Sequence, residues 1–258
     1  MNKQKDYWEK ATPMTFGPEK WTYEQKRKFR YELQDYQLDT YFSKYDFQDK
    51  QVLEFGCGAG IDSVEFARRG AQVISCDITW NAVKSTSELA KEAMLSAYVL
   101  AVMVEEKPPY KNLPSEYFDF VYSFGVLHHI KDVYLTLNEL VRILKPGGIL
   151  MGMVYNRDSL LFSHSILERW WHESNGQSSE DIAMASAYSE RIENAPYTRC
   201  YTKGEVETLL SRTLNMKDVK VEVKYNVIDT PNQRKVKYTL DPPDNDLGWH
   251  LCFEATKG

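Results

Sequence analysis

The chain has 258 residues, 43% of them hydrophobic and 27% charged, and its net charge is −5 at pH 7. This length and composition are typical of a globular α/β protein with a full apolar core. The acidic balance argues against a nucleic-acid partner, because a protein that grips a phosphate backbone normally carries a basic face. No apolar run approaches the roughly 20 residues that span a bilayer, and none follows the polar start of the chain, so we expect neither a membrane span nor secretion.

Four cysteines, Cys57, Cys76, Cys200 and Cys252, are spread along the chain. They form no C-x-x-C pair and have no metal-like spacing with the histidines. We therefore expect reduced thiols with structural roles, no metal site and a cytoplasmic protein.

Residues 1–46 are expected to form an N-terminal arm and helix that cap the ligand site of a main domain at 47–258. Aromatic residues such as Trp8 and Trp21 stand among turn formers in the arm. Apolar residues then recur at helical spacing over 22–45, which predicts one amphipathic helix.

From Gln51 onward, short apolar runs alternate with amphipathic segments. Strands are predicted at 52–55, 72–77, 98–104, 118–123 and 149–155. Helices are predicted between them at 61–69, 81–94 and 133–144. Repeated strand–helix alternation with short connections predicts a parallel sheet with helices on both faces.

The regular alternation lapses at 159–199, a segment that carries the pair Trp170-Trp171 and a polar stretch. We expect this insertion to form a lid near the ligand-binding edge of the sheet. An amphipathic helix is predicted at 202–214. Period-two alternation at 219–228 and 249–255 predicts two closing strands that pair antiparallel.

The run VLEFGCGAG at residues 52–60 points to a ligand. A strand that runs into closely spaced glycines and then a helix makes a tight turn where backbone can approach a ligand. The glycines fall at 56, 58 and 60, whereas a dinucleotide fold needs G-x-G-x-x-G, and Ile61 occupies its third glycine position. Glu54 also precedes the turn, where its negative charge is unfavourable beside a pyrophosphate but favourable beside an ammonium and a sulfonium. The motif therefore favours S-adenosylmethionine over a nicotinamide dinucleotide.

Asp77 ends the next predicted strand, 21 residues after Gly56. A carboxylate at this place can accept hydrogen bonds from both ribose hydroxyls of an adenosine ligand. A glycine-rich turn or a strand-terminal Asp is common when it occurs alone. The two in register indicate an adenosine site.

Further motifs follow in order along residues 50–156: FDFVYS at 118–123, GVLHHI at 125–130 and ELVRILKPGG at 139–148. Together with VLEFGCGAG and Asp77, they resemble the class I S-adenosylmethionine-dependent methyltransferases. The likeness is to the small-molecule branch that includes the ubiquinone/menaquinone-type enzymes. It implies a Rossmann-like sheet of seven strands, mostly parallel, with helices on both faces and one antiparallel strand near the C-terminus.

The resemblance also implies which residues bind S-adenosylmethionine and its product S-adenosylhomocysteine. These are Glu54, Gly56, Cys57, Gly58, Asp77, Ile78, Glu105 and Ser123. Glu54 and the glycine loop would hold the methionine part, Asp77 would hold the ribose, and Ser123 would line the methyl-donor site. Glu105 stands where the family usually has an acidic residue followed by Ala to contact the adenine amine, and here Glu106 follows it.

Two histidines, His128 and His129, are the candidate catalytic residues, because they follow the fourth predicted strand at the edge where such sheets bind ligands. Either could take a proton from the methyl acceptor, or the pair could belong to the scaffold of the loop. Tyr155, Arg157 and Trp170 are the candidate substrate-binding residues. Arg157 could instead form a surface ion pair, and the Trp170-Trp171 pair could instead be core.

The sequence predicts an S-adenosylmethionine-dependent methyltransferase that transfers a methyl group to an O, N or C atom of a small-molecule metabolite. One alternative is a catalytically inactive module that binds the cofactor. A protein or RNA methyltransferase is the other, and the acidic balance together with the lack of an appended basic domain argues against it. A nicotinamide oxidoreductase is excluded by the glycine spacing.

Overall fold

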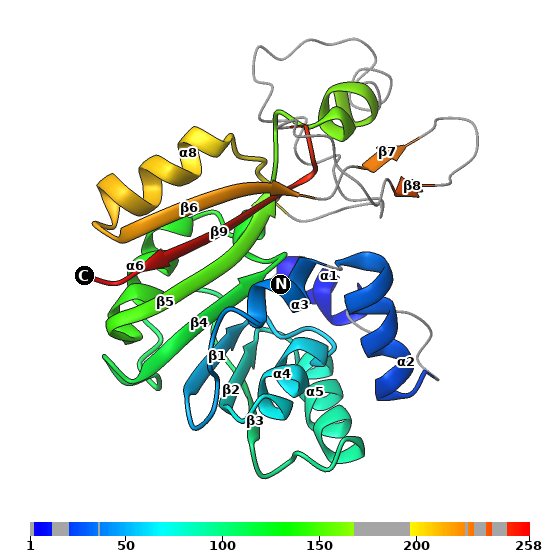
Figure 1. Cartoon of the computed structure of the whole chain (residues 1–258), viewed down its shortest axis with the longest axis vertical. Coiled ribbons are helices and arrows are strands. Elements are labelled where there is room, and N and C mark those ends of the chain that lie inside the picture. Colours follow the sequence, from blue (N-terminus) through cyan, green and yellow to red (C-terminus); the bar gives the residue numbers. More distant parts are fainter. Residues whose placement is uncertain are drawn as a thin grey trace. The chain divides into compact units, whose positions relative to one another are not determined.

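The computed structural model describes residues 3–11, 21–35, 37–167, 197–224, 227–229, 236–238 and 247–258 (Figure 1). The chain divides into two compact units. Unit 1 comprises residues 1–123, 138–150 and 257, and unit 2 comprises 124–137, 151–256 and 258. Within the described ranges, no helix is long and apolar enough to cross a membrane.

Seven strands join in one sheet, in the order β3-β2-β1-β4-β5-β9-β6 (Figure 1). Their bounds are β1 Gln51–Phe55, β2 Gln72–Asp77, β3 Val99–Met103, β4 Phe118–Phe124, β5 Leu144–Tyr155, β6 Lys217–Lys224 and β9 His250–Thr256. β1 pairs in parallel with β2 and β4, β2 pairs in parallel with β3, and β6 pairs antiparallel with β9. The prediction of a mostly parallel, Rossmann-like sheet with reversed pairing near the C-terminus is confirmed. A separate antiparallel pair joins β7 Val227–Asp229 to β8 Val236–Tyr238.

Helical segments precede and connect the strands. They are α1 Lys3–Ala11, α2 Tyr23–Lys28, η2 Phe29–Gln34, α3 Gln37–Phe42, α4 Ile61–Arg68, α5 Trp80–Glu92, η3 Leu127–His129, α6 Val133–Ile143, η4 Phe162–Ile166, α8 Lys203–Thr208 and η6 Leu209–Thr213. α4 and α5 matter most for the site, because each begins directly after the carboxyl end of a parallel strand. Ligands of such sheets bind at that edge.

An aromatic cluster fills the core of unit 1. Its members are Phe42 of α3, Phe47, Phe66 of α4, and Phe120 and Tyr122 of β4, all of them buried. The ring centroids of Phe42 and Phe66 lie 4.6 Å apart, and those of Phe66 and Tyr122 lie 5.2 Å apart. The N-terminal helices are thus held by apolar packing against the helix that follows the glycine loop.

The single helix predicted over 22–45 is wrong, because the structure breaks it at Asp35. This residue has φ −127° and ψ 54°, outside the helical region, and its N–H donates to the carbonyl oxygen of Arg30 at 2.8 Å. Its carboxylate is buried and accepts a hydrogen bond from the Arg30 guanidinium, so an ion pair holds Asp35 at this break. The strand predicted at 219–228 also ends early, at Lys224.

Strand β5 begins at Leu144 and not at 149, so the residues expected to connect the helix to the strand lie inside the strand. The reason is pairing with the C-terminus. The Gly147 N–H donates to the Lys257 carbonyl at 2.9 Å, and the Lys257 N–H donates to the Gly148 carbonyl at 2.9 Å.

Candidate active site

The glycine loop between β1 and α4 is folded as the motif predicts. Gly56, Gly58 and Gly60 have φ angles of 82°, 50° and 80°, a region that favours glycine. The Gly56 N–H donates to the Cys76 carbonyl oxygen at 2.8 Å, which fixes the loop to the end of β2. A Cβ on Gly60 would lie 2.6 Å from Thr86 of α5, so the loop also needs glycine for close packing.

Glu54 lies in β1 just before this loop and is 4% exposed. Its carboxylate accepts a short hydrogen bond from the Ser63 hydroxyl, which in turn accepts one from Ser75 at 2.6 Å. Burial, followed by the nearby charge of Asp62, raises the pKa of Glu54. In the described part of the chain Glu54 forms no ion pair, although the charge of Arg30 is near enough to lower its pKa in part.

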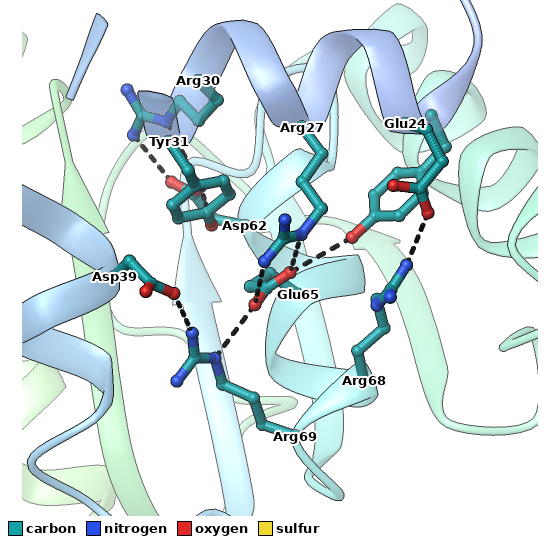
Figure 2. Close-up of polar contacts among 10 residues, drawn as sticks. Glu24, Arg27, Arg30, Tyr31, Asp39, Asp62, Glu65, Arg68 and Arg69 are labelled. Atoms are coloured by element: carbon teal, nitrogen blue, oxygen red, sulfur yellow. Dashed lines mark hydrogen bonds and ion pairs between the residues drawn. The ribbon is translucent and has the colours of Figure 1, made fainter. Parts of the chain in front are cut away.

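A buried charge cluster that includes Asp62 is centred on Arg30, which is 2% exposed, and its charges act on Glu54. Figure 2 shows Arg30, Tyr31 and Asp62 of this cluster. The Arg30 guanidinium donates to both carboxylate oxygens of Asp62, at 3.2 and 2.7 Å, and to Asp35. The hydroxyls of Tyr31 and Tyr122 donate to Asp62 at 2.6 and 2.9 Å.

Three buried carboxylates, those of Glu54, Asp62 and Asp35, therefore share the field of one buried guanidinium. Burial and the charge of Asp62 raise the pKa of Glu54 here, so a further cation beside it would stabilise its charged form. The ammonium and sulfonium of S-adenosylmethionine carry positive charge of the required sign, so these residues fit that cofactor. The sequence prediction did not include Asp62 and Asp35, because an acid on an amphipathic helix usually faces solvent.

A second charge network, centred on the buried Glu65, ties α2 to α4 in the same unit (Figure 2). Arg27 donates to Glu65 at 2.7 Å, and Arg69 bonds to Glu65 at 3.0 Å and to Asp39 at 2.5 Å. The exposed pair Arg68–Glu24 adds a contact at 2.7 Å. These ion pairs anchor the N-terminal helices to the helix that begins at the glycine loop.

Asp77 lies at the end of β2, close to the same loop. One carboxylate oxygen accepts from the Gly58 N–H at 3.1 Å, and the other accepts from the N–H and hydroxyl of Thr79 at 3.0 and 2.9 Å. Burial raises the pKa of Asp77, and these donors oppose that effect. The structure thus brings Asp77, Gly58 and the half-buried Ile78 together as the motifs predict, and the carboxylate retains lone pairs for ribose hydroxyls.

The remaining predicted cofactor residues differ in their surroundings. Cys57 is buried, and its sulfur accepts from the Thr86 hydroxyl at 3.3 Å. The hydroxyl of the fully buried Ser123 donates to the Phe55 carbonyl at 3.0 Å, which ties β4 to β1. Glu105 is exposed and follows β3, whose next residue, Val104, donates its N–H to the Asp77 carbonyl at 2.9 Å. Their contacts with a cofactor stay predictions.

The two histidines lie in η3 of unit 2, and both are buried. His129 Nδ1 lies 3.1 Å from the Thr198 hydroxyl and 3.3 Å from the Tyr197 carbonyl oxygen. Neither ring nitrogen of His128 has a hydrogen-bond partner among the described residues, although this side chain is 0% exposed. The two histidines, which the sequence could not distinguish, therefore differ in their hydrogen bonding.

An aromatic stack covers His128 in unit 2. The Tyr155 ring centroid lies 3.8 Å from that of His128 and 4.3 Å from that of Trp249, and the Tyr155 and Trp249 rings are stacked. The ring centroids of His250 and Tyr155 lie 6.4 Å apart, and the two rings are stacked. Trp249 and His250 were not among the predicted site residues, because alternation in a closing strand indicates only pairing and burial.

Arg157 forms an ion pair with Glu205 at 3.3 Å, and Arg199 pairs with the same carboxylate at 3.3 Å. The ion pair supports the interpretation of Arg157 as a partner in a surface pair, and a contact between Arg157 and a substrate stays a prediction. Trp170 and most of the 159–199 insertion lie outside the described residues. Across the described ranges, no group of three or more His, Cys, Asp or Glu residues is arranged to hold a metal ion.

The buried histidines predict a loss of stability in acid. Burial lowers the pKa of His129 to about 4 and the pKa of His128 well below 6.5. Between pH 6.5 and about 4, the unfolded chain therefore binds more protons than the folded chain, and the free energy of unfolding falls as the pH falls. His129 alone should contribute a loss of about 3 kcal/mol over this window.

Urea denaturation across this pH range measures the effect. His129→Asn, which keeps a polar side chain but removes the titrating group, should show a shallower dependence of the unfolding free energy on pH. An identical slope for the variant and the parent protein would mean that His129 titrates normally in the fold.

Comparisons with known proteins agree with this geometry. A family profile described as "Methyltransferase domain" matches residues 53–152. A ubiquinone biosynthesis O-methyltransferase of Bradyrhizobium is 31% identical over 117 residues, which cover 45% of this chain and 44% of that protein. The corresponding protein of Xanthomonas oryzae pv. oryzae is 30% identical over 151 residues, covering 57% and 60%. The chain thus spans about half the length of the curated relatives it matches.

The crystal structure of magnesium protoporphyrin IX methyltransferase from Synechocystis PCC 6803 with bound S-adenosylhomocysteine is 13% identical. It superimposes with a TM-score of 0.62 over 98% of each chain, which shows a shared fold. The family match, the strand order, the glycine loop and the buried acid all agree. Residues 53–152 of the chain match the methyltransferase domain family, and its fold is shared with solved methyltransferases.

Proposed function

We propose that this protein transfers the methyl group of S-adenosylmethionine to an O, N or C atom of a small-molecule metabolite. An oxygen acceptor is favoured, since the relatives at 30–33% identity are named ubiquinone biosynthesis O-methyltransferases. A cytoplasmic location is proposed with this function. It is supported by the cysteines, which are all free thiols: Cys57, Cys76, Cys200 and Cys252.

The single observation that carries the proposal is the buried carboxylate of Glu54, which has no cationic partner in the described chain. In the proposed site, Glu54 and the loop residues Gly56, Cys57 and Gly58 hold the methionine part of the cofactor. The ribose is held by Asp77. Three further residues complete the proposed cofactor site: Ile78, Glu105 at the adenine, and Ser123 beside the methyl donor.

On the acceptor side, His128 or His129 would remove a proton from the nucleophile, and Tyr155, Arg157 and Trp170 would hold the substrate. The bound cofactor supplies a methyl group that is electrophilic because its sulfur is positively charged. The protein aligns the acceptor atom with that methyl group and excludes water, and such positioning alone supplies several kcal/mol or more. A hydroxyl acceptor must also lose its proton, which a neutral imidazole can accept.

The acceptor class is tested by incubating the protein with radiolabelled S-adenosylmethionine and three acceptor pools: small-molecule extract, protein and RNA. We expect label in the small-molecule pool alone, on a product that can then be identified. Label on protein or RNA would replace this function with the macromolecular alternative. Cofactor binding with no labelled product from any pool would support an inactive module.

The role of Glu54 is tested by Glu54→Gln, which keeps the size of the side chain and removes its charge. Loss of one charge-assisted contact should weaken S-adenosylhomocysteine binding by about 10- to 100-fold. Binding of 5′-methylthioadenosine, which has the same nucleoside but no amino-acid tail, should stay unchanged. Both affinities can be measured by calorimetric titration.

Glu88→Gln is the matched control, because Glu88 lies on the exposed face of α5 with 68% of its side chain accessible. It should bind both nucleosides as the parent protein does. Equal weakening of the two ligands by Glu54→Gln would mean that Glu54 supports the fold of the loop and does not meet the amino-acid tail.

A further inference from the structure

The N-terminus of helix α5 is capped in part by a residue from a distant segment. The first N–H groups of a helix have no partner within it. In α5, the Ala82 N–H donates to the hydroxyl of the N-cap residue Thr79 at 3.3 Å. The N–H groups of Trp80 and Asn81 donate to the two carboxylate oxygens of Glu9, each at 2.9 Å.

Glu9 belongs to α1, and it is held to α5 by three bonds. Besides the two carboxylate contacts, the Asn81 side-chain amide donates to the Glu9 carbonyl oxygen at 2.6 Å. Both oxygens of one carboxylate thus serve adjacent N–H groups, with the negative charge at the positive end of the helix dipole. Residues separated by more than 70 positions in the sequence are joined by this contact.

The first turn of α5 comes directly after Asp77, the proposed ribose-binding residue, in the chain. Asp77 stands two positions before Thr79 and already accepts hydrogen bonds from its N–H and hydroxyl. Two carboxylates, those of Asp77 and Glu9, therefore lie at the same helix end. Without Glu9, the unpaired N–H groups of Trp80 and Asn81 would attract the carboxylate of Asp77, the nearer acid in the chain.

We propose that Glu9 is a positioning residue for the cofactor site: it satisfies the N-terminus of α5 so that the Asp77 carboxylate stays directed to the ribose. The inference deepens the cofactor assignment and rests on it. Because α1 supplies Glu9, docking of α1 and binding of the nucleoside stabilise each other, and by linkage each must strengthen the other equally.

The test compares two ligands with one ribose in common. In Glu9→Ala and Glu9→Gln, the affinities for S-adenosylhomocysteine and for 5′-methylthioadenosine should fall by the same factor, about 3- to 30-fold, the range of a lost helix cap. Glu54→Gln should weaken only the first ligand. A residue that merely stabilised the fold would lower the melting temperature without this shared change in affinity.

Asp6→Asn is the matched control, since Asp6 is an exposed acid on the same helix. It should leave both affinities unchanged. Hydrogen exchange on the parent protein provides a second measurement that needs no variant: S-adenosylhomocysteine should slow exchange of the amides of α1 as well as those of Trp80 and Asn81.

The role of Glu9 would be overturned if a folded Glu9→Ala variant bound both ligands as the parent protein does. It would also be overturned if S-adenosylhomocysteine did not change the rate of hydrogen exchange in α1. Either result would leave the cofactor assignment intact. A weakening confined to S-adenosylhomocysteine would also overturn it, because the ribose would then not be involved. If the parent protein bound neither nucleoside, the cofactor assignment would fall first and this inference with it.

Discussion

Replacing Arg30 by methionine is expected to lower the free energy of unfolding by about 3–5 kcal/mol, the usual cost of leaving a buried ion pair without one partner. Arg30 is 2% exposed and bonds to Asp62 at 2.7 Å and to Asp35. In the variant, the donors to Asp62 that remain among the described residues are the hydroxyls of Tyr31 and Tyr122, and a neutral donor does not offset the burial of a charge. Urea denaturation at neutral pH measures the loss.

Arg68→Met is the matched control, because it removes an arginine from an exposed pair. The side chains of Arg68 and Glu24 are 43% and 68% exposed, and such pairs contribute about 0–1 kcal/mol. The triple variant Arg30→Met, Asp35→Asn, Asp62→Asn should recover part of the stability, since the two carboxylates that pair with Arg30 are then neutral as well. Equal losses in Arg30→Met and Arg68→Met would mean that the cluster on Arg30 is solvated in the folded protein.

The cofactor loop could be predicted from sequence because its geometry is local. Parallel pairing sets Phe55 opposite Cys76 in β1 and β2. Residues that end two consecutive parallel strands must meet at one edge of the sheet, so Glu54 and Asp77 were placed together by strand order alone. The glycines that follow β1 needed only the positive φ angles that the turn imposes.

The contacts that support this loop could not be predicted, because each joins distant segments. Arg30, Asp62 and Glu9 are charged residues on amphipathic helices, where such residues normally face water. Only tertiary packing buries Arg30 against Asp62 or brings Glu9 to the start of α5. The break at Asp35 escaped prediction for the same reason, since its partner is the buried Arg30.

Loss of His128 should have the largest effect on turnover. If this imidazole accepts the proton of the methyl acceptor, His128→Ala should lower kcat by about 10²- to 10⁴-fold and leave S-adenosylhomocysteine affinity unchanged. His129→Ala should change kcat by less than about tenfold, because His129 Nδ1 is already engaged with Thr198. Its main effect should be on stability. Steady-state kinetics with the acceptor found by radiolabelling separates the two, and a larger kcat effect at His129 would reverse the assignment.

The burial of His128 also limits which acceptors it can serve. Burial lowers the pKa of His128 well below 6.5, so the imidazole is neutral at pH 7 and is a weak base. A weak base removes a proton efficiently only from a fairly acidic hydroxyl, and a ring hydroxyl with a pKa of about 10 is far more acidic than an aliphatic alcohol. The rings of Tyr155 and Trp249, stacked at 4.3 Å beside His128, are suited to a planar acceptor of that kind.

We therefore expect kcat to rise as electron-withdrawing substituents acidify a ring hydroxyl, and to hold steady as the pH falls through 6.5. A decline centred near 6.5 would mean that the proton goes to a solvent-exposed base and not to His128.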